Sequence, residues 1–262
     1  MGWYCRVQDS SMNVAILMTC HNRCETTLRC VARLQSAFDA TADCLFKVFL
    51  VDDGSTDGTA DAVRKSFPSV NIIEGDGNLY WAKGMNLAWR KSIAEDDDWD
   101  AYLWLNDDTV LGEDSIVRMM TADNGERIVV GELENSRGEI VYGMRKDGLF
   151  TGNCVLVPRR VYNRIGMICG EYSHAWADSD YAMQAKRTGI TVVSAGVVGE
   201  AEGHENRPSL KGISLGERWR MLFNPKGWNL HDLWLYRRRN WGICVALASC
   251  VHLIFHVIMG ER

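Results

Sequence analysis

The sequence predicts an α/β fold in which a mostly parallel central sheet is flanked by helices. Short apolar runs bounded by turn residues recur along the chain, and amphipathic helical stripes separate the early runs. Strands that alternate with helices in this way form parallel sheets. Hydrophobic residues make up 47% of the 262 residues, which indicates a globular chain rather than a disordered one. The formal net charge of −5 gives no general electrostatic reason to bind nucleic acid.

Seven apolar runs are the expected strands, at residues 14–18, 48–51, 70–73, 102–105, 128–130, 154–157 and 190–193. Apolar stripes with helical spacing predict helices over residues 28–38 and 85–93. A further helix is expected from Asp57, as its N-cap, to about Phe67. The helix that follows Trp176 should close at Gly189, in the position after the C-cap.

Three polar segments follow expected strands directly. They are TCHNR at residues 19–23, VDDGSTDG at 51–58 and NDDT at 106–109. Ligands of open α/β sheets bind beyond the carboxyl ends of the strands, so these segments are expected to meet in one crevice. A calcium loop counted from Asp53 is excluded, because its twelfth position is Arg64 instead of a carboxylate. A plain turn remains an alternative for this segment.

The adjacent carboxylates Asp107 and Asp108 are expected to bind a divalent metal. Two like charges at the end of a buried strand repel each other unless a cation lies between them. Oxygen ligands favour Mg²⁺ or Mn²⁺, and Mg²⁺ is commonly held by one or two carboxylates together with substrate phosphates. Two solvated acids in a turn are the alternative.

Asp178 and Asp180 fall at the start of the helix that ends at Gly189. Carboxylates stabilise a helix N-terminus, so capping explains either residue taken singly. A second acid beside the aromatic residues Trp176 and Tyr181 also fits a general base in a sugar-handling site. Both interpretations stay open from the residues alone.

The chain is expected to have three parts: a short leader at residues 1–12, a catalytic domain at 13–205 and an extension at 206–262. Nine cysteines without a C-x-x-C pair, and a start without a signal-peptide core, predict a cytoplasmic protein with reduced thiols. The extension is basic and Trp-rich, and residues 241–259 then contain no charged side chain. This segment could span a bilayer, lie in its interface or pack on the domain. We expect peripheral attachment at the cytoplasmic face of the inner membrane.

The motifs TCHNR, VDDGSTDGT, GNLYWAKGMNLA, LNDDT and WADSDYAMQAKRTG, in this order, resemble family 2 glycosyltransferases of the GT-A fold. The match spans about residues 13–200. The extension is similar to that of bacterial members that build polysaccharides, including rhamnosyltransferase-like proteins. The resemblance implies an inverting, metal-dependent transfer of sugar from a UDP- or dTDP-linked donor. The acceptor would be a hydroxyl of a glycan or lipid-linked molecule in cell-surface polysaccharide synthesis.

Carried over residue by residue, the resemblance assigns the nucleotide pocket to Thr19, Asn22, Asp52, Asp53 and Asp107. Asp108 would be the direct ligand of Mg²⁺ or Mn²⁺, and His204 a candidate further ligand. Asp178 would be the catalytic base and Asp180 a secondary acid. Trp81 and Trp176 are the aromatic residues expected at the sugar or acceptor. The family often has Glu-Asp where this chain has Ala177 and Asp178, and Asn106 replaces the first acid of its metal motif.

Two other functions compete with this interpretation. A sugar nucleotidyltransferase would be expected to carry a Gly-rich loop after the first strand, whereas the loop here, TCHNRCET, has no glycine. A non-catalytic nucleotide-sugar-binding protein of the same fold would be signalled by loss of the metal acids or the base, and all three acids are present.

Overall fold

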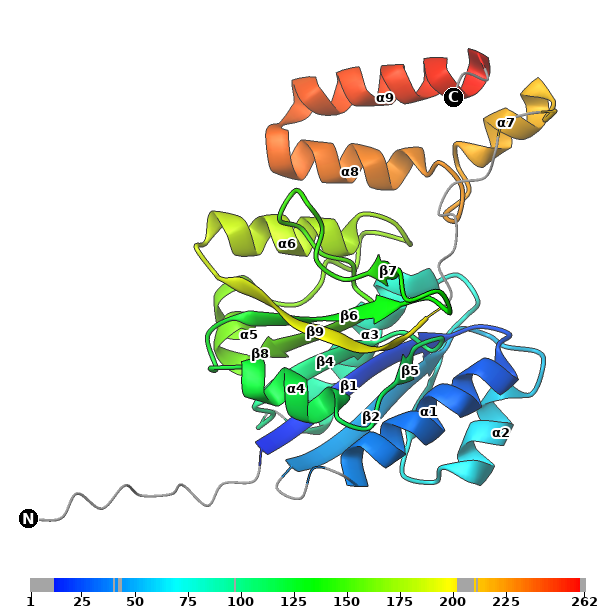
Figure 1. The fold of residues 1–262 in the computed structure, drawn as a ribbon. Coiled ribbons are helices and arrows are strands. Elements are labelled where there is room, and N and C mark those ends of the chain that lie inside the picture. The colour runs from blue at the N-terminus through cyan, green and yellow to red at the C-terminus, as the bar shows by residue number, and fades with distance from the viewer. Residues whose placement is uncertain are drawn as a thin grey trace, which may run out of the picture.

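The computed structural model describes residues 12–259, apart from 40, 42, 43, 97, 202–209 and 211. A single sheet runs through the molecule in the strand order β3-β2-β1-β4-β8-β6-β9-β5, and β7 pairs with β6 (Figure 1). The strands are β1 (Met12–Cys20), β2 (Cys44–Asp52), β3 (Asn71–Glu74), β4 (Ala101–Leu105), β5 (Val110–Leu111), β6 (Ile128–Glu134), β7 (Ile140–Tyr142), β8 (Cys154–Pro158) and β9 (Val192–Glu200).

The first four strands in chain order are parallel neighbours, so their carboxyl ends share one edge of the sheet. In register, Cys20 lies opposite Asp52 at the ends of β1 and β2, and Leu17 lies opposite Trp104 near the end of β4. The predicted convergence of the three polar segments is therefore confirmed. β8 is antiparallel to both β4 and β6, which makes the sheet mixed beyond β4.

Helices cover both faces of the sheet because side chains alternate along each strand. Ala15 and Leu17 of β1 face the core formed with α3 (Tyr80–Glu95), α5 (Arg159–Ile165) and α6 (Ala177–Arg187). The intervening Val14, Ile16 and Met18 face the opposite core. That core is formed with α1 (Cys24–Asp39), α2 (Thr59–Ser66) and α4 (Ser115–Ala122).

The seven expected strands are all present, and so are the expected helices. The expected N-cap Asp57 is wrong by one residue, because the N-cap of α2 is Gly58, whose φ of 84° suits glycine. Gly189 adopts a φ of 69° directly after the C-cap of α6, as predicted. The sequence did not reveal β5 and β7, which have two and three residues, or the short helices α4 and α5. Elements of this length hold too few residues to show a period.

The described part of the C-terminal extension contains the helices α7 (Leu215–Met221), α8 (Leu230–Trp241) and α9 (Ile243–Met259). The α8 and α9 helices are stacked beyond α6, and α7 lies to one side of them (Figure 1). A φ of 89° at Gly242 makes the reversal between α8 and α9. No helix of the described residues is both long enough and apolar enough to cross a membrane. The predicted leader, except Met12, and the predicted boundary at residue 205 lie outside the described residues.

Candidate active site

The aspartates of VDDGSTDG bind backbone N–H groups of the loops around the sheet edge. Asp52 Oδ1 accepts a hydrogen bond from the Ser55 amide at 2.8 Å. Asp53 accepts from the amides of Gly77, Leu79 and Tyr80, at 2.9, 3.0 and 2.8 Å. It thereby fixes the segment that leads into α3. Both carboxylates are buried, and their predicted contact with a nucleotide stays a prediction.

Thr19 and Asn22 lie at the end of β1, beside these loops. Asn22 has a φ of 51°, and its Oδ1 accepts from the Thr56 amide at 2.7 Å. Its own amide donates to Ser55 Oγ, so the first two polar segments are tied together. A Cβ at Gly84 of α3 would lie only 2.6 Å from Thr19 Oγ1. The close approach of α3 to the strand end therefore requires glycine there.

Arg23 lies between the two adjacent acids that follow β4. Its Nη1 donates to Asp107 Oδ1 at 3.1 Å and to Asp108 Oδ2 at 2.9 Å. Burial raises the pKa of Asp107 to about 6, although the Arg23 guanidinium acts in the opposite direction. The repulsion that the sequence predicted is thus relieved here by a side-chain cation, which the sequence analysis did not identify.

The site retains one feature that fits a metal ion. Asp108 Oδ1 is buried and has no hydrogen-bond partner, which is costly for a carboxylate oxygen unless a ligand occupies it. Within the described ranges, no three His, Cys, Asp or Glu side chains cluster closely enough to hold an ion by themselves. The donor set of Asp107 and Asp108 is therefore sparse, as for an Mg²⁺ site that substrate phosphates complete. His204 lies outside the described residues.

Asp178 reaches the same sheet edge from the first turn of α6. We call the sheet edge that carries Asp107, Asp108 and Asp178 the crevice. Its Oδ2 accepts from the Gly152 amide at 3.2 Å, and its Oδ1 accepts from the Ser179 amide at 2.6 Å. Burial raises the pKa of this carboxyl above its usual value. The Asn106 amide donates to Asn153 O, one residue beyond Gly152, so the end of β4 and Asp178 are joined through one short segment.

Trp81 lies between these two groups. Its Nε1 donates to Asn106 Oδ1 at 2.8 Å, and its ring packs edge-on against Trp104. A Cβ on Gly152 would lie 2.5 Å from the Trp81 ring and 3.3 Å from Asp178 Cβ. Glycine at position 152 is therefore what lets the indole and the carboxylate approach each other. The predicted contact of Trp81 with a sugar stays a prediction.

Asp180 and Trp176 contact the extension. Asp180 is fully buried and accepts from Arg239 Nε at 3.0 Å, Asn240 Nδ2 at 2.8 Å and Gln184 Nε2 at 3.1 Å. The Trp176 ring is stacked on Tyr236 of α8, with centroids 4.8 Å apart. These contacts give both residues a structural part, and their predicted roles as a secondary acid and a sugar contact remain untested.

Asp232 of α8 is a second buried carboxylate at the contact between the extension and α6. Asp232 accepts from the backbone amides of Ser173, His174 and Ala175 and from the Ser173 hydroxyl, at 3.0 to 3.1 Å. That loop immediately precedes α6. We call the interface that contains Asp180 and Asp232 the α6–α8 seam. The extension therefore holds both the helix that carries Asp178 and the loop that leads into it.

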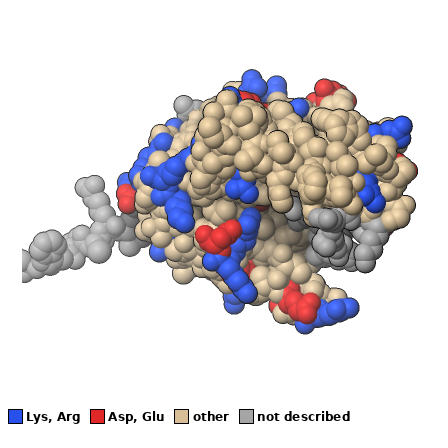
Figure 2. All heavy atoms as spheres, turned by 90° about the horizontal axis from the view of Figure 1, so that it is seen from above, with Lys and Arg blue, Asp and Glu red and all other residues tan. Residues whose placement is uncertain are grey.

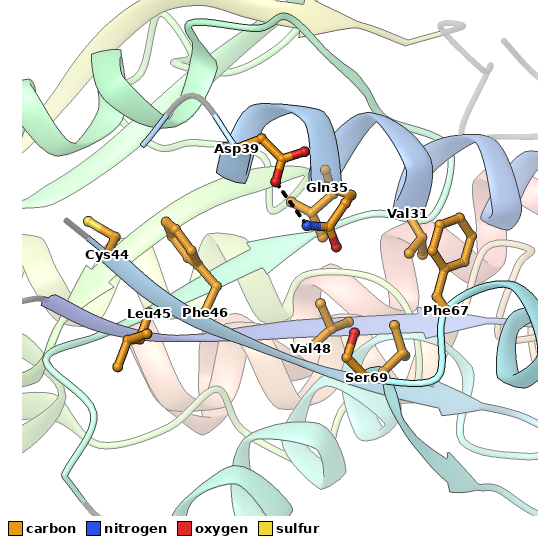
Figure 3. Close-up of a pocket in the computed structure, with 11 residues that line it drawn as sticks. Val31, Gln35, Asp39, Cys44, Leu45, Phe46, Val48, Phe67 and Ser69 are labelled. Carbon is orange, nitrogen blue, oxygen red and sulfur yellow. Dashed lines mark hydrogen bonds between the residues drawn. The ribbon is translucent and has the colours of Figure 1, made fainter. Parts of the chain in front are cut away.

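Sequence reasoning missed Arg23, Gly152, Asp232 and Arg239. The sequence held a signal for Arg23. It is a cation in TCHNR, which follows a strand next to the strand before NDDT, so a contact with the acids of NDDT could have been predicted. Gly152 and the seam residues had none, because their contacts join segments far apart in the chain. A pocket of about 320 Å³ between α1, the start of β2 and the turn after α2 lies at the opposite end of the strands, and polar side chains such as Gln35, Asp39 and Ser69 line it together with apolar ones (Figure 3).

Comparisons with known proteins agree with this architecture. The family model described as Glycosyl transferase family 2 matches residues 15–178, a range that begins in β1 and ends at Asp178. None of the curated proteins searched matches the chain significantly.

Solved structures with similar folds include the following two. One is the mannosyltransferase PcManGT from Pyrobaculum calidifontis in complex with GDP-Man and Mn²⁺, with a TM-score of 0.59 and 16% identity. That alignment covers 94% of this chain and 73% of the other. TarS residues 1–349 from S. aureus have a TM-score of 0.56 and 14% identity, over 95% of this chain and 71% of the other. The predicted GT-A fold is confirmed.

Proposed function

The chain belongs to glycosyl transferase family 2, and we propose that it transfers a sugar from a nucleoside-diphosphate sugar to an acceptor hydroxyl with inversion of the anomeric carbon. One observation carries the proposal. The same sheet edge carries an acid pair with a partnerless buried oxygen, at Asp108, and, linked to it through residues 152–153, a carboxylate of raised pKa, at Asp178. The first suits a diphosphate with its cation, and the second suits a proton acceptor.

In this reaction Asp178 takes the proton of the acceptor hydroxyl. The acceptor oxygen attacks the anomeric carbon as the bond between that carbon and the diphosphate oxygen breaks. The nucleoside diphosphate leaves with the electron pair, and a single displacement inverts the configuration. Two backbone N–H groups hold the Asp178 carboxylate in place, and neither can take the proton that it accepts.

Asp108, together with Asp107, would hold the divalent ion, Mg²⁺ or Mn²⁺. When bound, the ion would neutralise charge that develops on the departing diphosphate. Arg23 already contacts both acids and is half-exposed, so its guanidinium also adds positive charge at the place where the diphosphate would lie. A mannosyltransferase of similar fold binds Mn²⁺ with GDP-Man, which supports a metal at the corresponding edge of the sheet.

The acceptor is proposed to be a glycan or a lipid-linked molecule in cell-surface polysaccharide synthesis. A lipid-linked acceptor would be presented at the cytoplasmic face of a membrane, so peripheral attachment there is part of the proposal. Trp81 would contact the sugar or the acceptor, because its ring lies against the segment that binds Asp178. Thr19, Asn22, Asp52 and Asp53 would border the nucleotide.

A donor screen tests the proposal. UDP-, dTDP- and GDP-linked sugars are incubated with the protein, and release of nucleoside diphosphate is measured with Mn²⁺, with Mg²⁺ and with a chelator. We expect release from one donor class that needs a divalent ion and falls sharply in Asp178→Asn. Folded protein that releases no nucleoside diphosphate from any donor, or that releases it equally well as Asp178→Asn, would contradict the proposal.

A further inference from the structure

The outward face of α9 is mainly apolar, and His252 is an exposed ionisable residue on it. Ala246, Leu253 and Val257 are buried against the rest of the extension. On the other side, a row spaced four residues apart is between 54% and 66% exposed, namely Ile243, Leu247, Val251, Phe255 and Met259. Surface helices of globular proteins normally turn charged and polar residues to solvent. The α9 helix has no Asp, Glu, Lys or Arg at all.

Neighbouring segments enlarge this surface. Trp241, at the end of α8, is 44% exposed, and α7 and the turn after it add Leu215, Trp219 and Phe223 at 61%, 48% and 59%. α7 packs against the C-terminal end of α9, where Arg218 Nη1 donates to Ile258 O at 3.1 Å. Seen from above, the molecule presents a broad area without charged side chains (Figure 2). Contiguous exposed apolar patches of this kind mark interaction sites.

The charge around the patch is positive, although the whole chain has a formal charge of −5. Residues 212–259 contain six basic side chains and two acidic ones. One of the acids, Asp232, is buried, and the other, Glu217, is engaged in the capping box of α7. The Arg237 guanidinium lies 5.0 Å from the Trp241 ring, so a cation and an amphipathic aromatic meet at the corner between α8 and α9. Lys and Arg side chains lie around much of the edge of the patch in Figure 2.

We propose that this surface, defined by the outward row of α9 with Trp241 and the exposed apolar residues of α7, binds an anionic lipid bilayer. A helix of 17 residues rises about 26 Å. Because its inner face is packed on the extension, α9 would lie flat, with its outward row among the acyl chains and the arginines among anionic headgroups. A second copy of the chain fits less well, since a symmetric contact would bring two basic edges together.

The geometry links this surface to the reaction. α9 packs on α8, and α8 binds α6 and its preceding loop through Arg239 and Asp232. Docking of α9 on a bilayer would therefore hold the helix that carries Asp178 at a fixed distance from the lipid surface. The proposal rests on the proposed function only for the nature of the acceptor, because lipid binding is measured without any transfer.

Vesicle flotation with the full chain tests the proposal. The vesicles contain phosphatidylcholine alone or phosphatidylcholine with phosphatidylglycerol, at low and high salt. Leu247→Asp is compared with Leu45→Asp, a matched control, since Leu45 is 62% exposed at the start of β2, at the far end of the molecule. We expect the wild type and Leu45→Asp to float with anionic vesicles, and Leu247→Asp to lose about tenfold or more of that binding. Phe255→Ser should lose binding in the same direction.

Two results would overturn the proposal. One is wild-type protein that stays unbound with every vesicle and salt condition. The other is equal flotation of Leu247→Asp and Leu45→Asp, with circular dichroism showing both folded. Light scattering without lipid identifies the second-copy alternative, as a dimer that Leu247→Asp dissociates while no form floats. Flotation retained by a protein that releases no nucleoside diphosphate would count against the proposed function and leave the lipid surface standing.

Discussion

Two regions of the molecule contain buried carboxylates, and the hydrogen bonding of their oxygens differs between the two regions. In the α6–α8 seam, Asp180 and Asp232 have every oxygen occupied by donors from the protein. In the crevice, among the described residues, Asp108 keeps a buried oxygen without a partner, and Asp178 is bound by Gly152 and Ser179 without a cation in contact with it. A saturated carboxylate fixes the fold, whereas an unsaturated one is poised for a ligand or a proton.

The contrast is sharpest on α6 itself, where Asp178 and Asp180 stand two residues apart. Asp180 binds Arg239 and Asn240 of the extension, while Asp178 turns to Gly152 at the crevice. One helix therefore carries a structural acid and a candidate base. The expected consequence is that substitutions in the crevice lower activity with little change in stability, and substitutions in the seam do the reverse.

The largest expected effect belongs to Asp108→Asn. Loss of one anionic oxygen should remove several kcal/mol of transition-state stabilisation, or about a thousandfold in turnover, by weakening the hold on the divalent ion. Thermal unfolding should change little. Turnover is measured as nucleoside diphosphate release, and Mn²⁺ affinity by calorimetry. Full turnover by Asp108→Asn in chelator would refute the role of this residue.

Asp178→Asn should follow, with a fall of about a hundredfold or more, because the amide cannot accept the acceptor's proton. Donor affinity, measured by calorimetry, should stay near the wild-type value. The matched control is Asp180→Asn, which changes the same atoms two residues away. Should Asp180→Asn abolish turnover and Asp178→Asn leave it intact, the roles of the two acids would have to be exchanged.

The sequence predicts the crevice better than the seam, for a physical reason. Strand periods and the polar segments after them indicate the sheet, its flanking helices and the shared edge, because those signals are local. The partner of Asp180, Arg239, is 59 residues away, and the loop bound by Asp232 is equally distant. Neither contact leaves a pattern in either segment. For the same reason, Asp180 looked like a second functional acid.

The seam should show the third effect, on stability. Asp180→Asn leaves Arg239 without its carboxylate, and breaking a buried ion pair typically costs about 3–5 kcal/mol. Because the Arg239 side chain is 32% exposed, water partly compensates, and we expect about 2 kcal/mol in urea unfolding. Arg239→Gln should cost more than Asp180→Asn, because it leaves the fully buried Asp180 carboxylate without a cation. The double variant should lose less than the sum of the two single variants. Additive losses would mean that the pair does not act as a unit.

The smallest expected effect is on the pH dependence of the free energy of unfolding. Substitution of Asp178 should change this dependence, and substitution of an exposed acid should leave it unchanged. Burial raises the pKa of Asp178 in the folded chain above the usual value of 3.8, so the folded state keeps this proton at pH values where the unfolded state has lost it. The free energy of unfolding should therefore fall as pH rises from about 4 through the raised pKa, and then level off. The change is about 1.4 kcal/mol for each unit by which the pKa is raised.

Asp178→Asn should lose this pH-dependent component of the free energy of unfolding, and Asp61→Asn, at a site 88% exposed, should keep it. Urea unfolding at a series of pH values measures the difference between the two variants. An unchanged slope in Asp178→Asn would mean that the crevice does not hold this carboxyl in its protonated form, and the contrast with the seam would then rest on hydrogen bonding alone.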